Sequence, residues 1–512
     1  MHLMKSLSLN LQIIREALNW TSDLKVRKFK IRIDVAREAA VVFIDGLVDK
    51  KQINMHILRP LMLDLLVTEQ RLRKHSDLFD LLPNVLPTIE FKKTTSKLSE
   101  IIDGVLSGNA ALLVEGSKQA ALLETQGWEY RSIEKPDTEG TVRGPREGFI
   151  ENIQTNIVLL RRIIRDPAFT IEKMRLGRRT KTDVAIAYIK GLASEGLVAE
   201  VKKRLKRIDT DAILESGYIE QFIEDNPFSL FASIGNSEKP DKVAGKLLEG
   251  RVAILVDGTP FVLTAPMLLI ECFQNTEDYY ARPYFASFIR WIRFLSFALS
   301  VLSPALYIAL VTFHQELIPT PLLITMAAAR EGTPFPTVVE VILMIIIFEI
   351  LREASVRMPR SLGQAVSIVG ALVIGQAAVT AGLVGAPVVI LVALTAITTF
   401  IVPPMADAGT FLRLFLIIMA GTFGLFGILI GLLETLIHLA SLSSFGVPYL
   451  SPVTPISLTG LKDVFVRAPL WTMFNRTRIT DWYDPRQQEF RPMRELSGHG
   501  QKTLPNRRRY SS

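Results

Sequence analysis

Residue types that commonly carry catalysis are few in this sequence, and none of them is grouped. Metal and nucleophile sites need set spacings, such as HExxH, a glycine-rich phosphate loop or GxSxG, and none of these occurs. The only cysteine, Cys272, excludes a disulfide framework and a cysteine-rich metal site. We therefore expect no catalytic residues, no metal and no cofactor. The histidines are scattered: His2, His56, His75, His314, His438 and His499.

Acids within an apolar region are the remaining candidates for chemistry. An ionisable group inside a membrane is costly, so it is a functional candidate by default. Copies of one acid in a symmetric oligomer form a ring, and such rings favour cations. We assign this role to Glu349, whereas Glu353 can pair with Arg357 four residues later. The acids in or near the apolar region are Glu340, Glu349, Glu353 and Asp407.

A stripe of small and polar residues follows one face of the apolar segment 362–384. At 100° per residue these side chains fall on one side of a helix, and the other sides carry Val, Ile and Leu. Such a face lets helices pack closely. It can also line a water-filled path, where polar residues are tolerated. Both interpretations stay open for Gln364, Ser367, Ala371, Gly375, Ala378 and Gly382.

The charge distribution predicts a membrane part in the second half of the chain. Of the 512 residues 21% are charged, yet no lysine lies between Lys246 and Lys462, and only Asp407 and Arg413 are charged within 361–433. A soluble domain cannot hydrate such a stretch, so it belongs in lipid. The net charge of +8 fits the lysine and arginine excess of cytoplasmic segments better than nucleic-acid binding.

Apolar stretches predict the spans, but their number is ambiguous. The basic tail favours the cytoplasm and an even number of spans, while Arg352, Arg357 and Arg360 also favour the cytoplasm. We give the tail more weight. An aromatic collar is expected at the headgroups: Tyr279, Tyr280, Tyr284, Phe285 and Trp291. The expected spans are Phe294–Phe313, Leu362–Val384, Ala386–Val402 and Leu414–Leu433, and Val341–Phe348 is too short.

The first half contains an internal duplication. Apolar runs ending in glycine occur at 39–48 and 184–193, and again at 110–116 and 252–258. Gly116 follows Gly46 by 70 positions, and Gly258 follows Gly191 by 67, with helical patterns between the two runs of each half. Continuous apolar runs of this length are typical of buried strands. The sequence therefore predicts two related α/β subdomains with the order strand–helix–helix–strand.

The predicted fold class is α/β plus membrane α, with two related cytoplasmic α/β subdomains before a polytopic helical membrane domain. Arg143, Arg146 and Glu147 lie in a Gly- and Pro-rich loop, which is either a hinge between the subdomains or a partner contact. Our boundaries are 1–24 for an amphipathic segment that is not a signal peptide, 25–145 and 146–284 for the α/β subdomains, 285–440 for the membrane domain and 441–512 for the tail.

The sequence resembles the A-subunit family of bacterial spore germination receptors, the GerA type. The resemblance covers roughly residues 30 to 480. It rests on long motifs in the family's order: RGPREGF (143–149), NPFSLF (226–231), IGNSEKPDKVAGKLLEGRVAILVDGTPFVL (234–263), EDYY (277–280), FHQELIPTPLL (313–323), REGTPFP (330–336), FEILREASVRMPR (348–360) and GQAVSIVGALVIGQAAV (363–379).

This resemblance implies a multi-pass protein of the spore inner membrane that works with a nutrient-binding B subunit and a lipoprotein C subunit. It also implies self-association into a ring that forms a nutrient-gated ion channel. In that ring the 362–384 stripe would face the pore or a neighbouring subunit, with Glu349 near the mouth. A stage V sporulation AF-like paralogue, which is associated with dipicolinic acid release, and a non-conducting scaffold are the alternatives.

Overall fold

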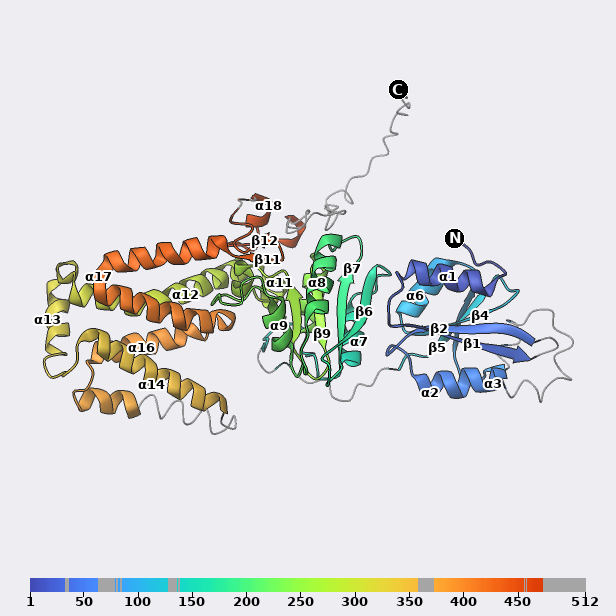
Figure 1. Cartoon of the computed structure of the whole chain (residues 1–512), viewed down its shortest axis with the longest axis horizontal. Helices are drawn as coiled ribbons and strands as arrows, with labels where there is room; N and C mark the ends of the chain where they lie inside the picture. The colour runs from blue at the N-terminus through green and yellow to red at the C-terminus, as the bar shows by residue number, and fades with distance from the viewer. Residues whose placement is uncertain are drawn as a thin grey trace, which may run out of the picture.

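Three structural parts follow one another along the chain. The computed structural model describes residues 1–32, 36–62, 79, 82, 85–127, 136, 139–357, 373–454, 456 and 458–472. In Figure 1 the first sheet domain lies at one end of the long axis, the second sheet domain in the middle and a helical bundle at the other end.

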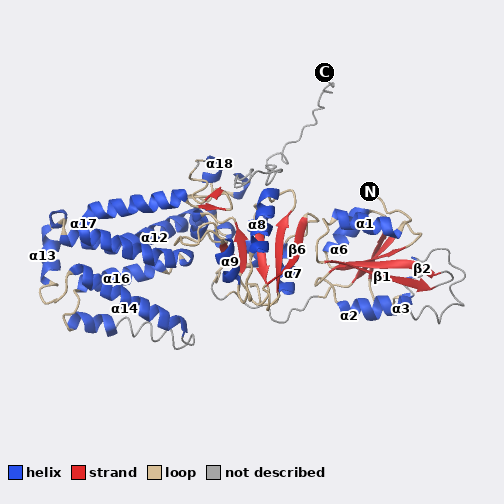
Figure 2. Ribbon diagram, in the orientation of Figure 1, coloured by secondary structure: helices blue, strands red, loops and turns tan. Residues whose placement is uncertain are grey.

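The first sheet is antiparallel throughout its described pairs and has the strand order β1-β2-β4-β5-β3. Helices cover both of its faces (Figure 2), so its central strands are buried on two sides and read as continuous apolar runs. Its strands are β1 (Leu24–Arg32), β2 (Ala36–Ile44), β3 (Phe91–Thr95), β4 (Asn109–Val114) and β5 (Ala120–Glu124); its helices are α1 (Leu7–Ala17), α2 (Lys50–Gln52), η1 (Ile53–Leu58), α3 (Arg59–Met62) and α6 (Leu98–Leu106).

The second sheet repeats this topology with the order β6-β7-β9-β10-β8. The predicted runs are β2, β4, β7 and β9, and each run lies beside its partner in one sheet. Duplicated topology is thus present in the structure. The elements are β6 (Phe169–Leu176), β7 (Thr182–Ile189), β8 (Gly235–Ser237), β9 (Val252–Val256) and β10 (Val262–Ala265), with α7 (Ile153–Ile163), α8 (Glu195–Arg207), α9 (Ser216–Ile223) and α10 (Pro240–Leu248).

A buried ion pair joins the two sheet domains. Arg161 of α7 donates from Nε to Asp23 Oδ2 at 2.8 Å, and its Nη2 donates to Thr21 Oγ1 at 2.9 Å. Asp23 stands directly before β1, so α7 of the second domain is attached to the entry of the first sheet. Val158, also on α7, belongs to the core under the first sheet. The helix α7 therefore belongs to both hydrophobic cores.

The helical part is a bundle of apolar helices. Two stretches, Pro283–Thr312 and Pro403–Ser441, are long and apolar enough to cross a membrane. The segments η3 (Leu269–Phe273) and α11 (Glu277–Tyr280) lead into it. Its elements are α12 (Pro283–Thr312), η4 (Gln315–Leu317), α13 (Thr320–Ala328), α14 (Thr337–Arg357), α16 (Ala386–Thr399), η5 (Pro403–Met405) and α17 (Ala406–Ser441).

The expected span Leu414–Leu433 is not one continuous helix, because α17 folds back on itself at Gly424. This glycine has φ 62° and ψ −139°, a backbone conformation outside the helical region. Two further glycines allow the arms to touch: Gly427 lies against the Met419 carbonyl, and a Cβ on Gly431 would lie 2.7 Å from Leu416 Cδ2. These glycines therefore allow the two arms of a helical hairpin to pack closely (Figure 1).

The stretch Val341–Phe348, expected to be too short to span, lies inside a longer helix. The 21-residue α14 includes the flanking acids Glu340 and Glu349 and is about 31 Å long at 1.5 Å per residue. Much of the expected span Leu362–Val384 lies outside the described residues; residues 373–380 are helical. The helix α16 falls within the expected Ala386–Val402 span, and α12 extends eleven residues before Phe294.

The chain after α17 returns to the second sheet domain. Ser444 Oγ donates to the Ser233 carbonyl at 2.6 Å, and the Leu269 N–H donates to the Tyr449 carbonyl at 3.0 Å. The described elements here are β11 (Ser443–Ser444), β12 (Val447–Pro448), α18 (Leu458–Leu461) and η6 (Leu470–Thr472). Residues after 441 therefore begin on the same side of the bundle as the sheets.

Removing one partner of the Arg161–Asp23 pair should destabilise the protein strongly. Asp23→Asn leaves a buried guanidinium without its counter-ion, for which we expect a loss of about 3–5 kcal/mol in the free energy of unfolding. The matched control is Asp183→Asn, which breaks the exposed pair with Arg175 and should cost under about 1 kcal/mol. Chemical denaturation of the full chain in detergent measures both; equal losses would contradict the buried role.

Glu220 on α9 should make the second domain less stable as pH rises. Burial, with repulsion from Glu224 and Glu215, raises the pKa of Glu220 to about 7 from 4.5. The folded state then binds this proton more tightly than the unfolded state, so stability falls between about pH 4.5 and 7. Glu220→Gln should melt higher than wild type at pH 8 and lose that advantage at pH 4.5. Glu151→Gln, at an exposed site, should show no such difference.

Candidate functional site

Four segments of the chain meet where the second sheet domain joins the bundle. They are α10, the η3–α11 segment, the first turns of α12, and residues 458–472. We call this region the junction. The direct chain connection between the sheets and the bundle runs through it, because α12 starts directly after α11.

Arg290 of α12 is the centre of the junction. Its side chain is fully buried. Its Nε donates to Asp278 Oδ2 at 2.9 Å, and its Nη1 donates to Asp463 Oδ1 at 2.8 Å. Arg293, one turn later, donates to the same Asp278 oxygen at 2.8 Å. Two arginines and two acids thus fix the base of α12 to α11 and to the C-terminal segment.

Tyr279 completes this network. Its hydroxyl donates to Asp463 Oδ2 at 2.6 Å, and the guanidinium groups of Arg290 and Arg467 lie over its ring. Burial, reinforced by the Asp463 charge, raises the pKa of Tyr279 well above its usual range, so the hydroxyl stays protonated and can donate. Tyr279 therefore bonds within the protein and not at the headgroups, whereas the headgroup position of Tyr284, Phe285 and Trp291 stays a prediction.

A second buried network lies beside the first. Glu271 of η3 pairs with both Lys246 and Arg251, and Arg251 also donates to the Pro266 carbonyl at 2.7 Å. Burial alone would raise the pKa of Glu271, but the charges of Arg251 and Lys246 outweigh it and hold that pKa below its ordinary value. Burial and the nearby Arg251 lower the pKa of Lys246. The carboxylate therefore stays ionised between two cations.

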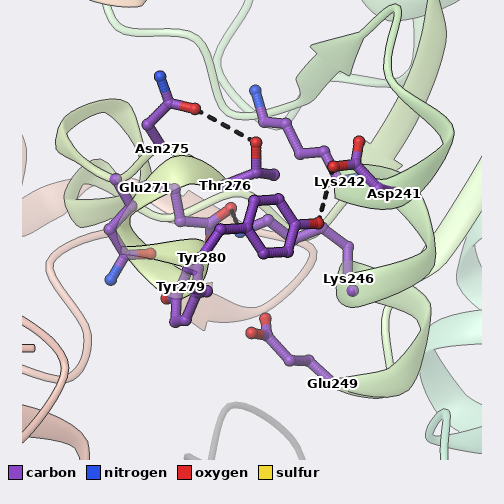
Figure 3. A pocket seen from close by; sticks show the side chains of 11 residues that line it. Asp241, Lys242, Lys246, Glu249, Glu271, Asn275, Thr276, Tyr279 and Tyr280 are labelled. Atoms are coloured by element: carbon purple, nitrogen blue, oxygen red, sulfur yellow. Dashed lines mark hydrogen bonds and ion pairs between the residues drawn. The ribbon is translucent and has the colours of Figure 1, made fainter. Parts of the chain in front are cut away.

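The junction contains a cavity of about 190 Å³ (Figure 3). Tyr280 donates from its hydroxyl to Asp241 Oδ2 at 2.8 Å, which places this second collar tyrosine in the cavity wall. Lys239 Nζ reaches Thr276 Oγ1 at 3.2 Å. The wall is made by Asp241, Lys242, Gly245, Lys246, Glu249, Glu271, Gln274, Asn275, Thr276, Tyr279 and Tyr280.

The Gly- and Pro-rich loop predicted as a hinge or partner contact reaches the junction. The backbone N–H groups of Val142 and Arg143 both donate to Glu277 of α11. The side chains of Arg143, Arg146 and Glu147 are exposed, and Glu147 lies 3.5 Å from Arg162. The role of these three residues as a hinge or a partner contact stays a prediction.

Glu349 is held within the bundle by positive neighbours. Its Oε2 lies 2.9 Å from Arg352 Nε and its Oε1 lies 3.8 Å from Nη1 of the buried Arg413. Arg413 itself donates to the Ser300 carbonyl at 2.7 Å and to Thr399 Oγ1 at 2.8 Å, so it joins three helices. The position of Glu349 at a pore mouth stays a prediction.

The stripe is only partly within the described chain. Gln364, Ser367 and Ala371 lie outside the described residues. A Cβ on Gly375 would lie 3.3 Å from Val389 of α16, and Ala378 packs on the bundle core. Gly382 ends its helical segment with φ 68°. The role of this stripe in a pore or between subunits stays a prediction.

The junction acids and arginines were not selected from the sequence. Asp463 lies 173 residues from Arg290, and no local pattern connects them. The available signals were the EDYY motif and two arginines, Arg290 and Arg293, one turn apart at the start of an apolar helix. Charges at the start of an apolar helix need partners, so these two arginines indicate acids folded against them.

The single cysteine should report on the junction. Burial, with the nearby Glu271 charge, raises the pKa of Cys272 to about 12, so maleimide labelling of the native protein at pH 8 should be slow. Asp278→Asn leaves Arg290 and Arg293 without that carboxylate, and Arg293 also holds the carbonyl beside Cys272. We expect labelling to accelerate at least tenfold. Asp209→Asn at an exposed pair is the control; equal rates would argue against the network's role.

Comparison with known proteins agrees with the resemblance described from the motifs. The family model described as Bacillus/Clostridium GerA spore germination protein matches residues 12–479. Spore germination protein KA of Bacillus subtilis (strain 168) is 47% identical over 470 residues, which cover 91% of this chain and 85% of that protein. The uncharacterized membrane protein YfkQ of the same strain is 43% identical over 469 residues, covering 91% and 89%.

A solved structure is also similar. It is the crystal structure of the N-terminal domain of the A subunit of the Bacillus megaterium spore germinant receptor GerK3, at 37% identity and a TM-score of 0.42. The match covers 52% of this chain and 98% of that one. From the family match and the identities of its relatives, this chain belongs to the GerA family of spore germination proteins, which are not enzymes.

Proposed function

We propose that this chain is the A-type subunit of a nutrient germinant receptor in the spore inner membrane. Copies of it form a ligand-gated cation channel whose opening triggers germination, in a complex with B and C subunits. Family membership supports a role in spore germination. The observation that carries the rest is an apolar outer surface on the bundle, attached by buried charges to large sheet domains.

The outer surface of the bundle is suited to lipid. Large apolar side chains are exposed on every long helix, and a patch of this extent in water would drive association. In a bilayer the same side chains face apolar lipid tails, and the helices satisfy their own backbone hydrogen bonds. Examples are Phe288, Leu295, Ile346, Ile350, Ile390, Ile397, Phe411, Phe426, Leu429, Leu433 and Ile437.

The path of the chain supports placing the sheets and the residues from 442 onward on the same side of the membrane. The turn of α17 at Gly424 contacts His314 and Phe313, just beyond the far end of α12. Both ends of α17 lie at the junction side: η5 contacts η3, and His438 Nε2 lies 3.1 Å from Ser229 Oγ. If the sheets are cytoplasmic, residues after 441 start there too, in line with an even number of crossings.

The junction supplies a route for gating. A signal received by the sheet domains or their partners can reach α12 through Arg290, because that guanidinium is shared by α11 and the C-terminal segment. Coupling needs an element that has two arrangements and that both sites bias. We assign that role to the junction. The nutrient itself is expected to bind the B subunit.

Potassium flux through liposomes that contain this chain with its B and C subunits tests the proposal. Wild type should pass potassium when the nutrient is added. Ser367→Leu should reduce that flux at least tenfold if the 362–384 face lines the path, because a larger apolar side chain removes both space and a hydroxyl.

The matched control is Thr422→Leu, at an exposed hydroxyl on α17, which should change the flux less than twofold. Assembly is checked for each variant by size-exclusion chromatography. Normal flux through Ser367→Leu would remove the pore role of that face. A wild-type complex that responds to nutrient but never conducts would favour the scaffold alternative.

A further inference from the structure

The second sheet domain exposes large apolar side chains on α9 and on the segments beside it. Tyr218 and Phe222 lie four residues apart and so share one face of α9, whereas Ile219 and Ile223 are buried in the core under the second sheet. Phe228, in the segment after α9, is completely exposed. Exposed apolar side chains that gather in this way mark an interaction surface. We call this set the apolar patch: Leu214, Tyr218, Phe222, Phe228 and Leu230.

The patch lies where the second sheet domain meets the end of the bundle. Ser229 Oγ is 3.1 Å from Nε2 of His438, which stands in the last turn of α17. Phe231 is buried in the apolar core of the bundle. Phe228 and Leu230 therefore flank a residue that contacts the end of α17, and α9 lies on the bundle side of the second sheet domain (Figure 1).

The apolar outer surface of α17 continues up to this contact. Its second arm exposes Leu432, Leu433, Leu436 and Ile437. Ile437 directly precedes His438, so the surface suited to lipid reaches the helical turn against which Ser229 lies. A bilayer around the bundle therefore has its boundary close to this turn, and the side chains beside Ser229 are at the depth of that boundary. The apolar patch thus continues the apolar outer surface of the bundle.

Positive charge lies near the patch. Arg204 of α8 donates to the Ile223 carbonyl at 2.7 Å and pairs with Asp225, so the last turns of α8 are attached to the end of α9. These turns also carry the exposed bases Lys206 and Arg207. Exposed cations beside aromatic side chains suit a surface of anionic phospholipid headgroups.

The acids of this region are largely engaged within the protein. Glu224 accepts hydrogen bonds from the N–H and the hydroxyl of Ser233. Glu220, on α9 itself, is half-buried. Asp209 and Asp211, just after α8, are paired with arginines of the turn before β7. The exposed bases of α8 therefore keep their attraction for an anionic surface.

We propose that the apolar patch enters the headgroup layer of the membrane that holds the bundle, with Phe228 inserted among the lipids. The proposal rests on the proposed function only for the position of the bundle in a membrane. An aromatic ring is stable at the boundary between headgroups and acyl chains, whereas in water a completely exposed Phe228 is unfavourable. The second sheet domain then contacts lipid directly, in addition to its connection through the junction.

Fluorescence quenching of the full chain in nanodiscs of phosphatidylcholine and phosphatidylglycerol tests this contact. Phe228→Cys carries an environment-sensitive fluorophore, and wild type, whose only cysteine is buried, gives the background. Lipids brominated near the headgroup end of the acyl chain should quench the label about twofold, and lipids brominated near the chain end should quench it less. Leu230→Cys is a second site in case the first variant does not fold. Met55→Cys, at an exposed position of the first sheet domain, should show no quenching.

A label on the bundle separates this proposal from the proposed function. Leu433→Cys, on the apolar surface of α17, should be quenched by brominated lipid if the bundle lies in the membrane. Quenching there but not at Phe228→Cys or Leu230→Cys would overturn the patch contact and retain the membrane position. No quenching at any of the three sites would overturn both. A label at Phe228→Cys that brominated lipid does not quench, but that is shielded when B and C subunits are added, would assign the patch to a protein partner instead of lipid.

Discussion

The arrangement of this protein depends on a single buried guanidinium. Arg290 lies in the second turn of α12, where the chain passes from the sheet domains to the bundle, and it is compensated by acids from two other segments. A buried arginine is tolerated only with such partners. Because one partner, Asp463, comes from the far end of the chain, the C-terminal segment must fold back onto the second sheet domain. The end of the bundle and its beginning are thereby held at one place.

Duplication explains the other half of the molecule. Two sheets with the same strand order each bury their central strands between helices, and α7 contributes side chains to both domains. In the second copy α10, which precedes β9 as α6 precedes β4 in the first, contributes to the junction together with η3. The first copy has no comparable contact with the bundle in the described residues. The two copies thus share one fold, but only the second contacts the bundle in the described residues, through the segments that connect its strands.

The sequence predicts the elements whose signal is local. Continuous apolar runs correctly indicate β2, β4, β7 and β9, and uninterrupted apolar length indicates α12 and α16. The sequence does not predict the flanking strands, because β1 carries five basic residues and β3 is mostly polar. The sequence does not predict the hairpin in α17, because glycines in an apolar helix are equally compatible with close packing of a straight helix against its neighbours. Asp463 bonds Arg290 and Tyr279, which lie 173 and 184 positions away, and local patterns carry no information about such partners.

The series arrangement of the two sheet domains has a mechanical consequence. The first domain is attached to the second through α7 and the segment before β1, and it lies farthest from the bundle along the long axis (Figure 1). If this attachment is stiff, the two domains turn together as a lever whose pivot is the junction. A small rotation at the pivot then becomes a large displacement at the tip. Conversely, a weak force on the first sheet exerts a larger torque on α12 than the same force close to the junction.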